Sequence, residues 1–313
     1  LYSSFKCASF LIPLILLSNI KIQDRVSALF SYASFWGGLV SVSLFGLTLV
    51  LAYAIHRYGE GAPEVTKLNR GYSYILMLLW PYMAWWGAEK KVHHSFRGRC
   101  VFGLLLCMLL ISLVITHSRA AQVAAVASCF VFVLAWLFPR LTVAGIAGAA
   151  VLFMGWPFYA RWLFTEHHGA LALLPGSWAH RVEIWDYFSY RIQESPWLGW
   201  GMGSAGQLEW AVPHGAFYAL VQNAAAHPHN AVVQLWSDLG IAGLFLYLFM
   251  VLGALRLVGR LASEFRPYAL ACLTFVLCLL LCAYNLWTDS LWASIALTMF
   301  TFALLNRRKL SQC

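Results

Sequence analysis

The stretch HPHNAVVQLWSDLGIAGLFLYLFMVLGAL, residues 227–255, joins a polar segment to a long apolar one. Its first half contains two histidines, an Asn, a Gln and an Asp, whereas the half that follows Gly240 is almost entirely hydrophobic. Such an apolar run is typical of a helix that crosses a bilayer, where polar side chains are costly unless they are paired or functional. The stretch therefore predicts a membrane protein with functional groups at one end of a span.

The composition of the whole chain points the same way. Of its 313 residues, 61% are hydrophobic and 11% are charged, which is too little polar surface to cover a water-soluble globule. The formal net charge is +9, but the basic residues form short clusters between apolar runs, which argues against a nucleic-acid-binding protein. We therefore expect an all-α fold, a polytopic transmembrane helix bundle embedded in membrane lipids.

Nine apolar segments are long enough to predict spanning helices. They are approximately residues 7–20, 34–55, 72–88, 100–117, 120–138, 141–159, 240–255, 268–287 and 291–305. Clusters of Lys and Arg between alternate segments indicate the cytoplasmic side. We expect one membrane domain, residues 1–313, with an outward-facing loop, residues 160–239, inserted in it. Because Leu1 would lie outside the cytoplasm, an odd number of helices is expected to precede it.

The outer loop contains a predicted amphipathic helix, HRVEIWDYFSYRIQ, residues 180–193. Its apolar face would carry Val182, Trp185, Phe188 and Ile192, and its polar residues would lie elsewhere: Arg181, Glu183, Asp186 and Gln193. The glycine-rich stretch 194–206 follows and breaks the helix. It lacks the strand-to-helix context of a nucleotide-binding loop.

A second helix is predicted at the end of this loop. Because proline suits a first helical position, we expect it to begin at His227 or Pro228 and to end or bend at Gly240. It would lie at the membrane surface with a polar seam of Asn230, Gln234 and Asp238, which could also serve only to hold the loop to the bundle.

His229 would then lie in the first turn of this helix, where the helix dipole disfavours an imidazolium. A neutral ring that can accept a proton near pH 7 has the properties of a general base. His229 is therefore the candidate catalytic residue. His227 and His180 are alternatives for the same role. The alternative to any catalytic role is that His229 is an interfacial histidine whose ring bonds only to backbone.

Three arginines are predicted on the same side of the membrane as His229: Arg119, in the short turn 116–121, and Arg181 and Arg191. Guanidinium groups pair with phosphate oxygens at any pH, so these residues are candidate substrate-binding groups, with Asn230 as an orienting residue. The alternatives are contacts with lipid headgroups, and for Arg191 an ion pair with Glu194 or Asp186. The pattern predicts displacement from a lipid-linked phosphate or diphosphate.

No metal or other cofactor is expected. The sequence has no Asp-rich cation site, and its cysteines show neither zinc-ligand spacing nor a disulfide framework.

Several of these motifs resemble a known family. His229-Asn230, nine residues, Gly240, two residues and Gly243 resemble the outer-loop signature of bacterial O-antigen ligases, O-antigen polymerases and protein O-oligosaccharyltransferases. The stretches 118–121 and 180–203 resemble two further family segments in the same order. The resemblance implies a GT-C-like glycosyltransferase of the bacterial inner membrane. It would move a glycan from undecaprenyl diphosphate on the periplasmic face, without metal and with inversion at the anomeric carbon.

The resemblance also implies residue roles: His229 matches the essential histidine, and Arg119 and Arg181 match the arginines for the donor diphosphate. A lipid A-core hydroxyl is the favoured acceptor because the outer loop is of moderate length. A growing glycan or a protein hydroxyl would be the acceptor in a polymerase or an oligosaccharyltransferase. A transporter of lipid-linked glycan is the rival class, but transporters tend to carry ionisable groups near the bilayer midplane, whereas here they lie at segment ends. A non-enzymatic envelope scaffold is a third possibility.

Overall fold

The computed structural model describes residues 65–88, 96, 103, 118–166, 173, 176–206 and 227–310. Every regular element within these ranges is a helix, which confirms the all-α prediction. The predicted spans 7–20 and 34–55, and nearly all of 100–117, lie outside the described residues.

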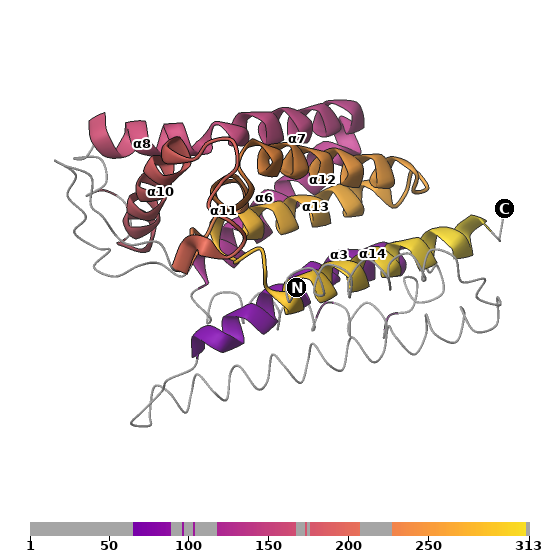
Figure 1. The fold of residues 1–313 in the computed structure, drawn as a ribbon. Coiled ribbons are helices and arrows are strands. Elements are labelled where there is room, and N and C mark those ends of the chain that lie inside the picture. The colour runs from indigo at the N-terminus through magenta and orange to yellow at the C-terminus, as the bar shows by residue number, and fades with distance from the viewer. Residues whose placement is uncertain are drawn as a thin grey trace, which may run out of the picture. The chain divides into compact units, whose positions relative to one another are not determined.

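The helices follow one another along the chain as shown in Figure 1. They are α3 (Val65–Ala88), α6 (Arg119–Leu137), α7 (Pro139–Met154), α8 (Trp156–Glu166), α10 (Gly176–Glu194), the 3₁₀ turn η1 (Ser204–Gly206), α11 (Ala231–Leu239), α12 (Ile241–Gly259), α13 (Arg266–Cys282) and α14 (Asp289–Leu310). They form two compact units. The first contains residues 1–139, 258–278 and 289–313, and the second contains residues 140–257 and 279–288.

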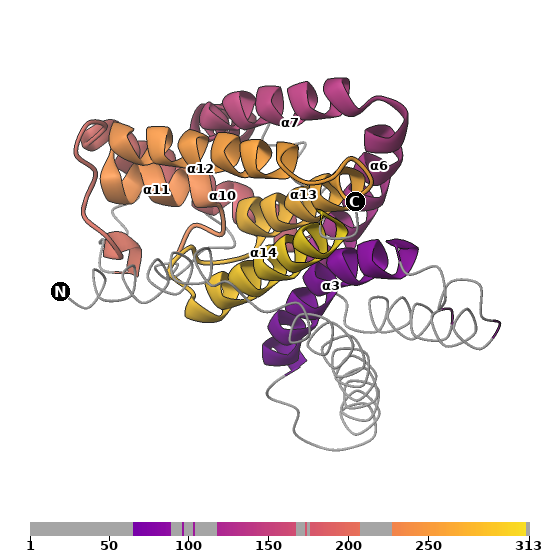
Figure 2. The same ribbon diagram turned by 90° about the vertical axis from the view of Figure 1, so that its right-hand side faces the viewer.

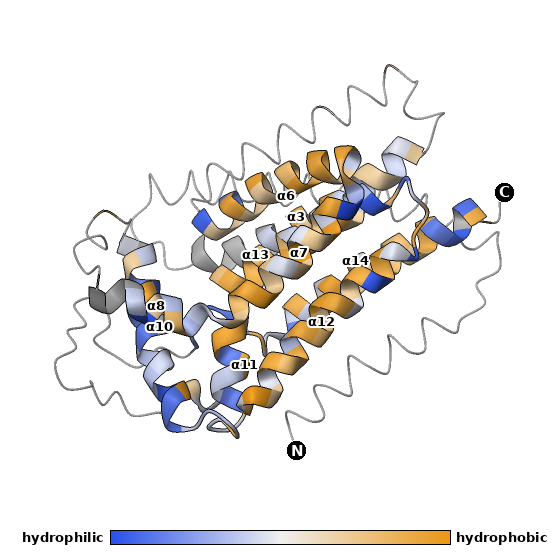
Figure 3. Ribbon diagram, turned by 90° about the horizontal axis from the view of Figure 1, so that it is seen from above, coloured by the Kyte–Doolittle hydropathy of each residue, from blue (hydrophilic) through white to orange (hydrophobic). Residues whose placement is uncertain are grey.

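Three of the described helices, α6, α12 and α14, are long and apolar enough to cross a membrane. The bent pair α7 and α8 would make a fourth span if it crosses as one. Figure 3 shows the difference in character between elements: α12 is largely hydrophobic, whereas α10 carries many hydrophilic residues. The protein is therefore a multi-pass membrane protein built from helices.

In the first unit, aromatic side chains tie the helices together. Helices α3 and α14 lie side by side, as both Figure 1 and Figure 2 show, and the Tyr74 hydroxyl is 3.0 Å from the Ser290 hydroxyl. The Phe132 ring of α6 lies 5.5 Å from the ring of Trp80 and 4.8 Å from the ring of Tyr268. Close ring packing of this kind holds apolar helices together where water supplies no driving force.

The predicted span 141–159 is not one straight helix. Helix α7 ends at Met154, α8 begins at Trp156, and the axis bends by 60° between them. Pro157 explains the break, since it has no N–H to continue the hydrogen bonds of α7 but is tolerated in the first turn of a new helix. The bend brings α8 along α10.

The predicted span 268–287 extends beyond the helix found there, because α13 ends at Cys282. The next residues form a turn around Asn285, whose side-chain oxygen accepts a hydrogen bond from the Trp287 N–H at 2.9 Å. Its main-chain oxygen accepts another from the Thr288 N–H at 3.2 Å. Asn side chains that bond to nearby backbone in this way compete with a helix, which is why the helix stops.

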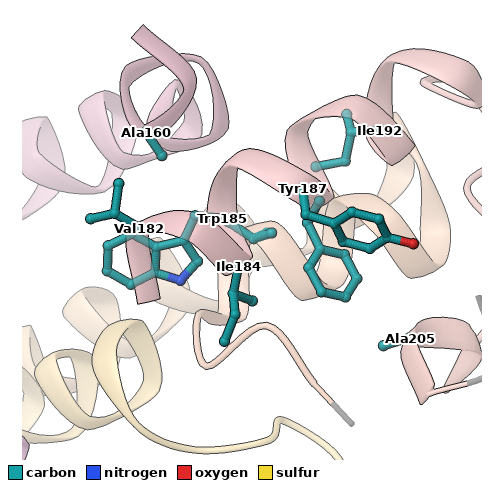
Figure 4. Packing of buried hydrophobic residues seen from close by; sticks show 9 residues of the cluster. Ala160, Val182, Ile184, Trp185, Tyr187, Ile192 and Ala205 are labelled. Atoms are coloured by element: carbon teal, nitrogen blue, oxygen red, sulfur yellow. The ribbon is translucent and has the colours of Figure 1, made fainter. Parts of the chain in front are cut away.

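The core of the second unit lies around α10. Figure 4 shows side chains of α10 between Ala160 of α8 and Ala205 of the 194–206 stretch. The rings of Trp156 and Trp185 meet edge to face, with their centroids 5.2 Å apart. The predicted apolar face, Val182, Trp185, Phe188 and Ile192, is buried here.

Two of the polar residues predicted for α10 are buried, although Gln193 is exposed. Glu183 is 4% exposed and Asp186 is 0% exposed. Carboxylates this deep are costly unless other groups compensate them, so α10 is a buried helix of the unit and not an amphipathic surface helix.

Two glycines let α11 and α12 meet end to end. Gly240 ends α11, as predicted, with φ 63° and ψ −150°, a backbone conformation that is essentially restricted to glycine. A Cβ atom at Gly240 would overlap the Trp197 carbonyl, and a Cβ atom at Gly243 would overlap the Leu235 carbonyl. Both positions therefore need glycine for close backbone approach.

We predict that Gly240→Ala lowers the free energy of unfolding by about 3 kcal/mol or more, from backbone strain and the overlap with Trp197. Gly253→Ala is the matched control within α12, because a Cβ atom there would meet nothing within 4 Å. Thermal unfolding of both variants in detergent tests this difference. Equal melting temperatures for the two variants would contradict it.

Candidate active site

Helix α11 begins later than predicted, at Ala231 and not at His227 or Pro228. Its N-cap is Asn230, whose side-chain oxygen accepts hydrogen bonds from the N–H groups of Val232 at 2.9 Å and Val233 at 3.1 Å. Asn is among the preferred N-cap residues because it satisfies donors that the helix leaves open. His229 therefore lies just outside the helix, before its cap.

The backbone of His229 is held in an unusual conformation. Its φ is 54°, and among the non-glycine residues that the structure describes it alone has a positive φ. The Pro228 carbonyl accepts a buried hydrogen bond from the Trp185 indole at 2.8 Å, which ties this segment to α10. The His229 N–H donates to Nδ1 of His227 at 3.3 Å, and the two rings lie 4.0 Å apart, nearly perpendicular.

One contact determines which nitrogen of His229 carries the proton. Nδ1 lies 2.9 Å from the main-chain oxygen of Ala283, in the turn after α13. A carbonyl oxygen can only accept, so Nδ1 must be the donor in this bond. In the neutral ring Nε2 is then the unprotonated nitrogen, with a lone pair that can accept a proton.

The surroundings keep the His229 ring neutral. Burial is the main cause that lowers its pKa, to about 4, and the charges of His227, Arg181 and His180 lower it further, while the bond to Ala283 opposes the shift. The predicted position of His229 in the first turn of α11 was wrong, because it precedes the N-cap. Loss of hydration and nearby positive charge are the physical causes.

Arg181 lies on α10, near His229. Its guanidinium carbon is 5.4 Å from the centre of the Trp178 ring, and burial lowers the pKa of this group, with the Cys282 thiol opposing. Its charge contributes to the depressed pKa of His229. The fold therefore brings together four residues that the sequence singled out: His180, Arg181, His227 and His229.

Arg191 lies further along α10, ten residues from Arg181, which is about 15 Å of helix. Its Nε donates to the Tyr187 hydroxyl at 2.9 Å, and its Nη1 forms an ion pair with Glu194 at 2.9 Å. Burial lowers the pKa of Arg191, but its bonds to Tyr187 and Glu194 outweigh this and raise it overall. The alternative of an ion pair is thus realised, with Glu194.

Arg119 is the first residue of α6 and is exposed. Its Nη1 donates to the Gln122 side chain at 3.3 Å. It belongs to the first unit, whereas the other candidate residues belong to the second.

Gln234 connects α11 to the turn that carries Ala283. Its Nε2 donates to the Asn285 side chain at 2.8 Å, and its Oε1 accepts from the Leu286 N–H at 2.9 Å. Sequence reasoning missed Ala283 and Asn285 because it assigned both to a membrane span. The polar residue Asn285 within that apolar run was the available signal.

Asp238 holds two segments at once. Its Oδ2 accepts from the Trp287 indole at 2.8 Å and from the Gly203 N–H at 3.3 Å. Burial raises the pKa of this carboxyl, against the effect of those two bonds. The predicted seam of Asn230, Gln234 and Asp238 thus holds loops around the helix, and all three residues are buried. Helix α11 is also enclosed by protein, which the sequence pattern did not predict.

A metal centre would need a cluster of suitable ligands. Within the part of the chain that the structure describes, no three His, Cys, Asp or Glu residues lie close enough to hold an ion.

Much of this site lies in a part of the chain that is similar to known proteins. Residues 103–248, which include Arg119, α10 and all of α11, match the O-antigen ligase family. This match covers just under half of the chain, so the likeness to O-antigen ligases is shown for these residues. The resemblance drawn from the sequence is thereby confirmed over these residues.

Three similar proteins from Rickettsia are each named as a candidate polysaccharide ligase. The R. conorii protein is 32% identical over a stretch that covers 37% of this chain and 29% of the relative. The R. bellii protein is 24% identical over 90% of this chain and 70% of the relative. The R. typhi protein is 27% identical over 59% of this chain and 47% of the relative. The chain thus spans less than half of two of these relatives. No solved structure matches it.

We predict that His229 makes stability depend on pH. Its pKa is about 4 when folded and 6.5 ordinarily, so between these values the unfolded chain binds more protons. The free energy of unfolding should therefore fall by up to about 3 kcal/mol as pH drops through this range. His229→Asn, which tolerates a positive φ, should flatten that slope in melting experiments from pH 4 to 7. Parallel curves for the two proteins would contradict it.

Proposed function

We propose that this protein is a polysaccharide ligase that transfers a glycan from undecaprenyl diphosphate to a lipid A-core hydroxyl on the periplasmic face. The observation that carries the proposal is the neutral His229, with its proton on Nδ1 and with Arg181 nearby. The match of residues 103–248 to the O-antigen ligase family and the names of the relatives support the same reaction class.

In this reaction, Nε2 of His229 removes the proton from the acceptor hydroxyl. The hydroxyl oxygen attacks the anomeric carbon, and the bond between that carbon and the diphosphate oxygen breaks. The diphosphate leaves with the bonding electron pair, so a single displacement inverts the anomeric configuration. The Ala283 carbonyl stabilises the imidazolium that forms, because it accepts the Nδ1 hydrogen bond throughout.

A base with a pKa of about 4 is too weak to remove a hydroxyl proton efficiently. Donor binding corrects this in the proposed mechanism. A diphosphate beside Arg181 balances the positive charge that depresses the His229 pKa and adds negative charge near the ring, and both effects raise that pKa. The base therefore becomes effective when the donor is present.

Arg181 is the proposed principal contact of the second unit with the diphosphate, because a guanidinium can bond two phosphate oxygens at once. Arg119 is the proposed second contact, on the strength of the family resemblance. Arg191 would contribute only if a phosphate displaced Glu194. Asn230 is fully buried and uses its oxygen to cap α11, so its proposed role is to orient the adjacent His229. Charge on the leaving group is thus stabilised by arginine, and the proposed mechanism is metal-independent.

The first test is His229→Asn. Purified protein supplied with lipid-linked glycan and acceptor should lose transfer by about 10²- to 10⁴-fold, the usual contribution of a general base. Donor binding should be retained. Translocation of glycan without transfer by the unchanged protein would instead indicate a transporter.

The same variant tests in cells which kind of acceptor the protein uses. In a deletion strain that carries His229→Asn, lipopolysaccharide gels should show core alone, with the lipid-linked polymer still made. Core with one repeat unit would indicate a polymerase, and an unchanged ladder would contradict both.

The two arginines of α10 give a matched comparison. Arg181→Lys keeps the charge but loses two-point bonding, so kcat/KM should fall by about 10²-fold, as for loss of one donor to a developing charge. Arg191→Lys should reduce kcat/KM much less, because Arg191 is already bonded to Tyr187 and Glu194. Steady-state kinetics at saturating acceptor measures both. An equal loss of kcat/KM in the two variants would contradict the proposal that Arg181 is the principal contact with the diphosphate.

A further inference from the structure

One loop of the second unit exposes an unusual amount of apolar surface. We call residues 195–203 the Trp197 loop. Four of its side chains are exposed: Trp197 by 70%, Leu198 by 84%, Trp200 by 40% and Met202 by 41%. Large apolar side chains gathered in this way mark a surface that contacts something other than water. Nothing in the proposed transfer reaction uses these side chains.

The backbone of the loop is firmly held, so the side chains are displayed by a fixed frame. Within the loop, the Gly199 N–H donates to the Ser195 carbonyl at 3.0 Å, and the Ser195 hydroxyl donates to the Gly199 carbonyl at 2.9 Å. Toward α11, the N–H groups of Trp200 and Gly201 donate to the carbonyls of Ser237 and Asp238 at 2.8 and 3.0 Å. The polar groups of the loop thus bond inward to protein.

The loop lies against the start of a candidate membrane span. A Cβ atom at Gly240 would overlap the Trp197 carbonyl, and Ile241, the next residue, begins α12. The Trp197 loop is therefore level with the end of α12, which is long and apolar enough to cross the bilayer. That end is where a span meets the lipid–water boundary, and tryptophans are enriched at this depth.

The apolar surface continues from the loop onto neighbouring elements. The Trp236 indole of α11 donates to the Pro196 carbonyl at 3.2 Å, and its ring meets Phe158 of α8, 5.4 Å away and edge to face. Phe158 is itself 48% exposed, and on α12 Phe249 is 74% exposed. Exposed apolar side chains thus occur on the loop, on α8 and along the span.

We propose that the Trp197 loop is a membrane anchor, whose Trp197 and Leu198 side chains enter the boundary between headgroups and acyl chains of the leaflet where α12 begins. The partner is bilayer lipid. The direct continuity of the loop with the span favours lipid over a partner protein, because a protein would have to cover the loop at the level where lipid already surrounds α12.

The anchor has a consequence for the active site, and this consequence rests on the proposed function. The loop is bonded to Ser237 and Asp238 of α11, and α11 follows directly on His229. The depth at which the loop enters the lipid therefore sets the height of His229 above the membrane surface. A lipid-linked diphosphate would lie at that surface, because its polyprenyl tail is held in the bilayer.

Site-specific photocrosslinking tests the anchor without any assay of transfer. The photoreactive residue p-benzoylphenylalanine is introduced at position 198, at position 193 and at position 249, one at a time, in the protein reconstituted into vesicles of phosphatidylethanolamine and phosphatidylglycerol. Gln193 is an exposed residue of α10 only five positions before Leu198, and Phe249 is an exposed residue within a candidate span. Position 193 serves as the water-facing reference, and position 249 serves as the lipid-facing reference.

We expect lipid adducts at position 198 at a level within about threefold of position 249 and at least tenfold above position 193. Only protein that elutes as a single species in size-exclusion chromatography is compared, and position 197 provides a second probe if the variant at 198 does not fold. Adducts at 198 no more abundant than those at 193 would overturn the proposal. So would adducts formed at 198 chiefly with protein. Because no glycan transfer is measured, failure of the anchor is distinguishable from failure of the proposed reaction.

Discussion

The second unit depends on one constraint: α11 is a nine-residue helix enclosed by protein, so its polar side chains must find their partners inside the fold. Asn230, Gln234 and Asp238 recur every four residues and make a single stripe along it. The three side chains bond to different parts of the chain. Asn230 bonds to the first turn of α11 itself, Gln234 to the turn after α13, and Asp238 to that turn and to the Trp197 loop. One short helix therefore holds both the turn after α13 and the Trp197 loop.

The orientation of His229 follows from this arrangement. Its ring is fixed by the Ala283 carbonyl, and the turn that carries Ala283 is held in place by Gln234. Its backbone is fixed from the other side by the bond between Trp185 and Pro228. Both supports come from outside α11, so the geometry of the ring depends on α10 and on the end of α13 as much as on its own sequence neighbours.

Sequence patterns predicted the parts of the fold that local composition determines. The apolar runs located α6, α12 and α14, and Gly240 marked the end of α11. The bend before Pro157 was missed because average hydropathy does not reveal a backbone hydrogen bond that proline cannot donate. The end of α13 at Cys282 was missed because average hydropathy does not reveal that the Asn285 side chain bonds to nearby backbone. The start of α11 was misplaced because Pro228 was given more weight than Asn230, although capping by a side chain decides where the hydrogen bonds begin.

Burial was the hardest property to predict. Glu183 and Asp186 have the spacing of a solvent-facing stripe, but both are buried in α10, which packs against α8 and α11. For the candidate site, the sequence identified His229 and Arg181 by residue type and by family resemblance. It could not supply the Ala283 carbonyl, since a main-chain oxygen has no signature in sequence.

The depressed pKa of His229 has opposite effects in the free protein and in the proposed donor complex. In the free protein, a pKa of about 4 keeps Nε2 unprotonated even in mildly acidic surroundings, so the base is not lost to bulk protons. The same shift makes the ring a poor proton acceptor, and it arises from burial and from positive charges, including that of Arg181. A bound diphosphate pairs with Arg181 and places negative charge beside the ring, which raises the pKa toward the value at which a base is most effective. Since the leaving group itself makes this adjustment, the acceptor would be deprotonated only when a donor is in place to react.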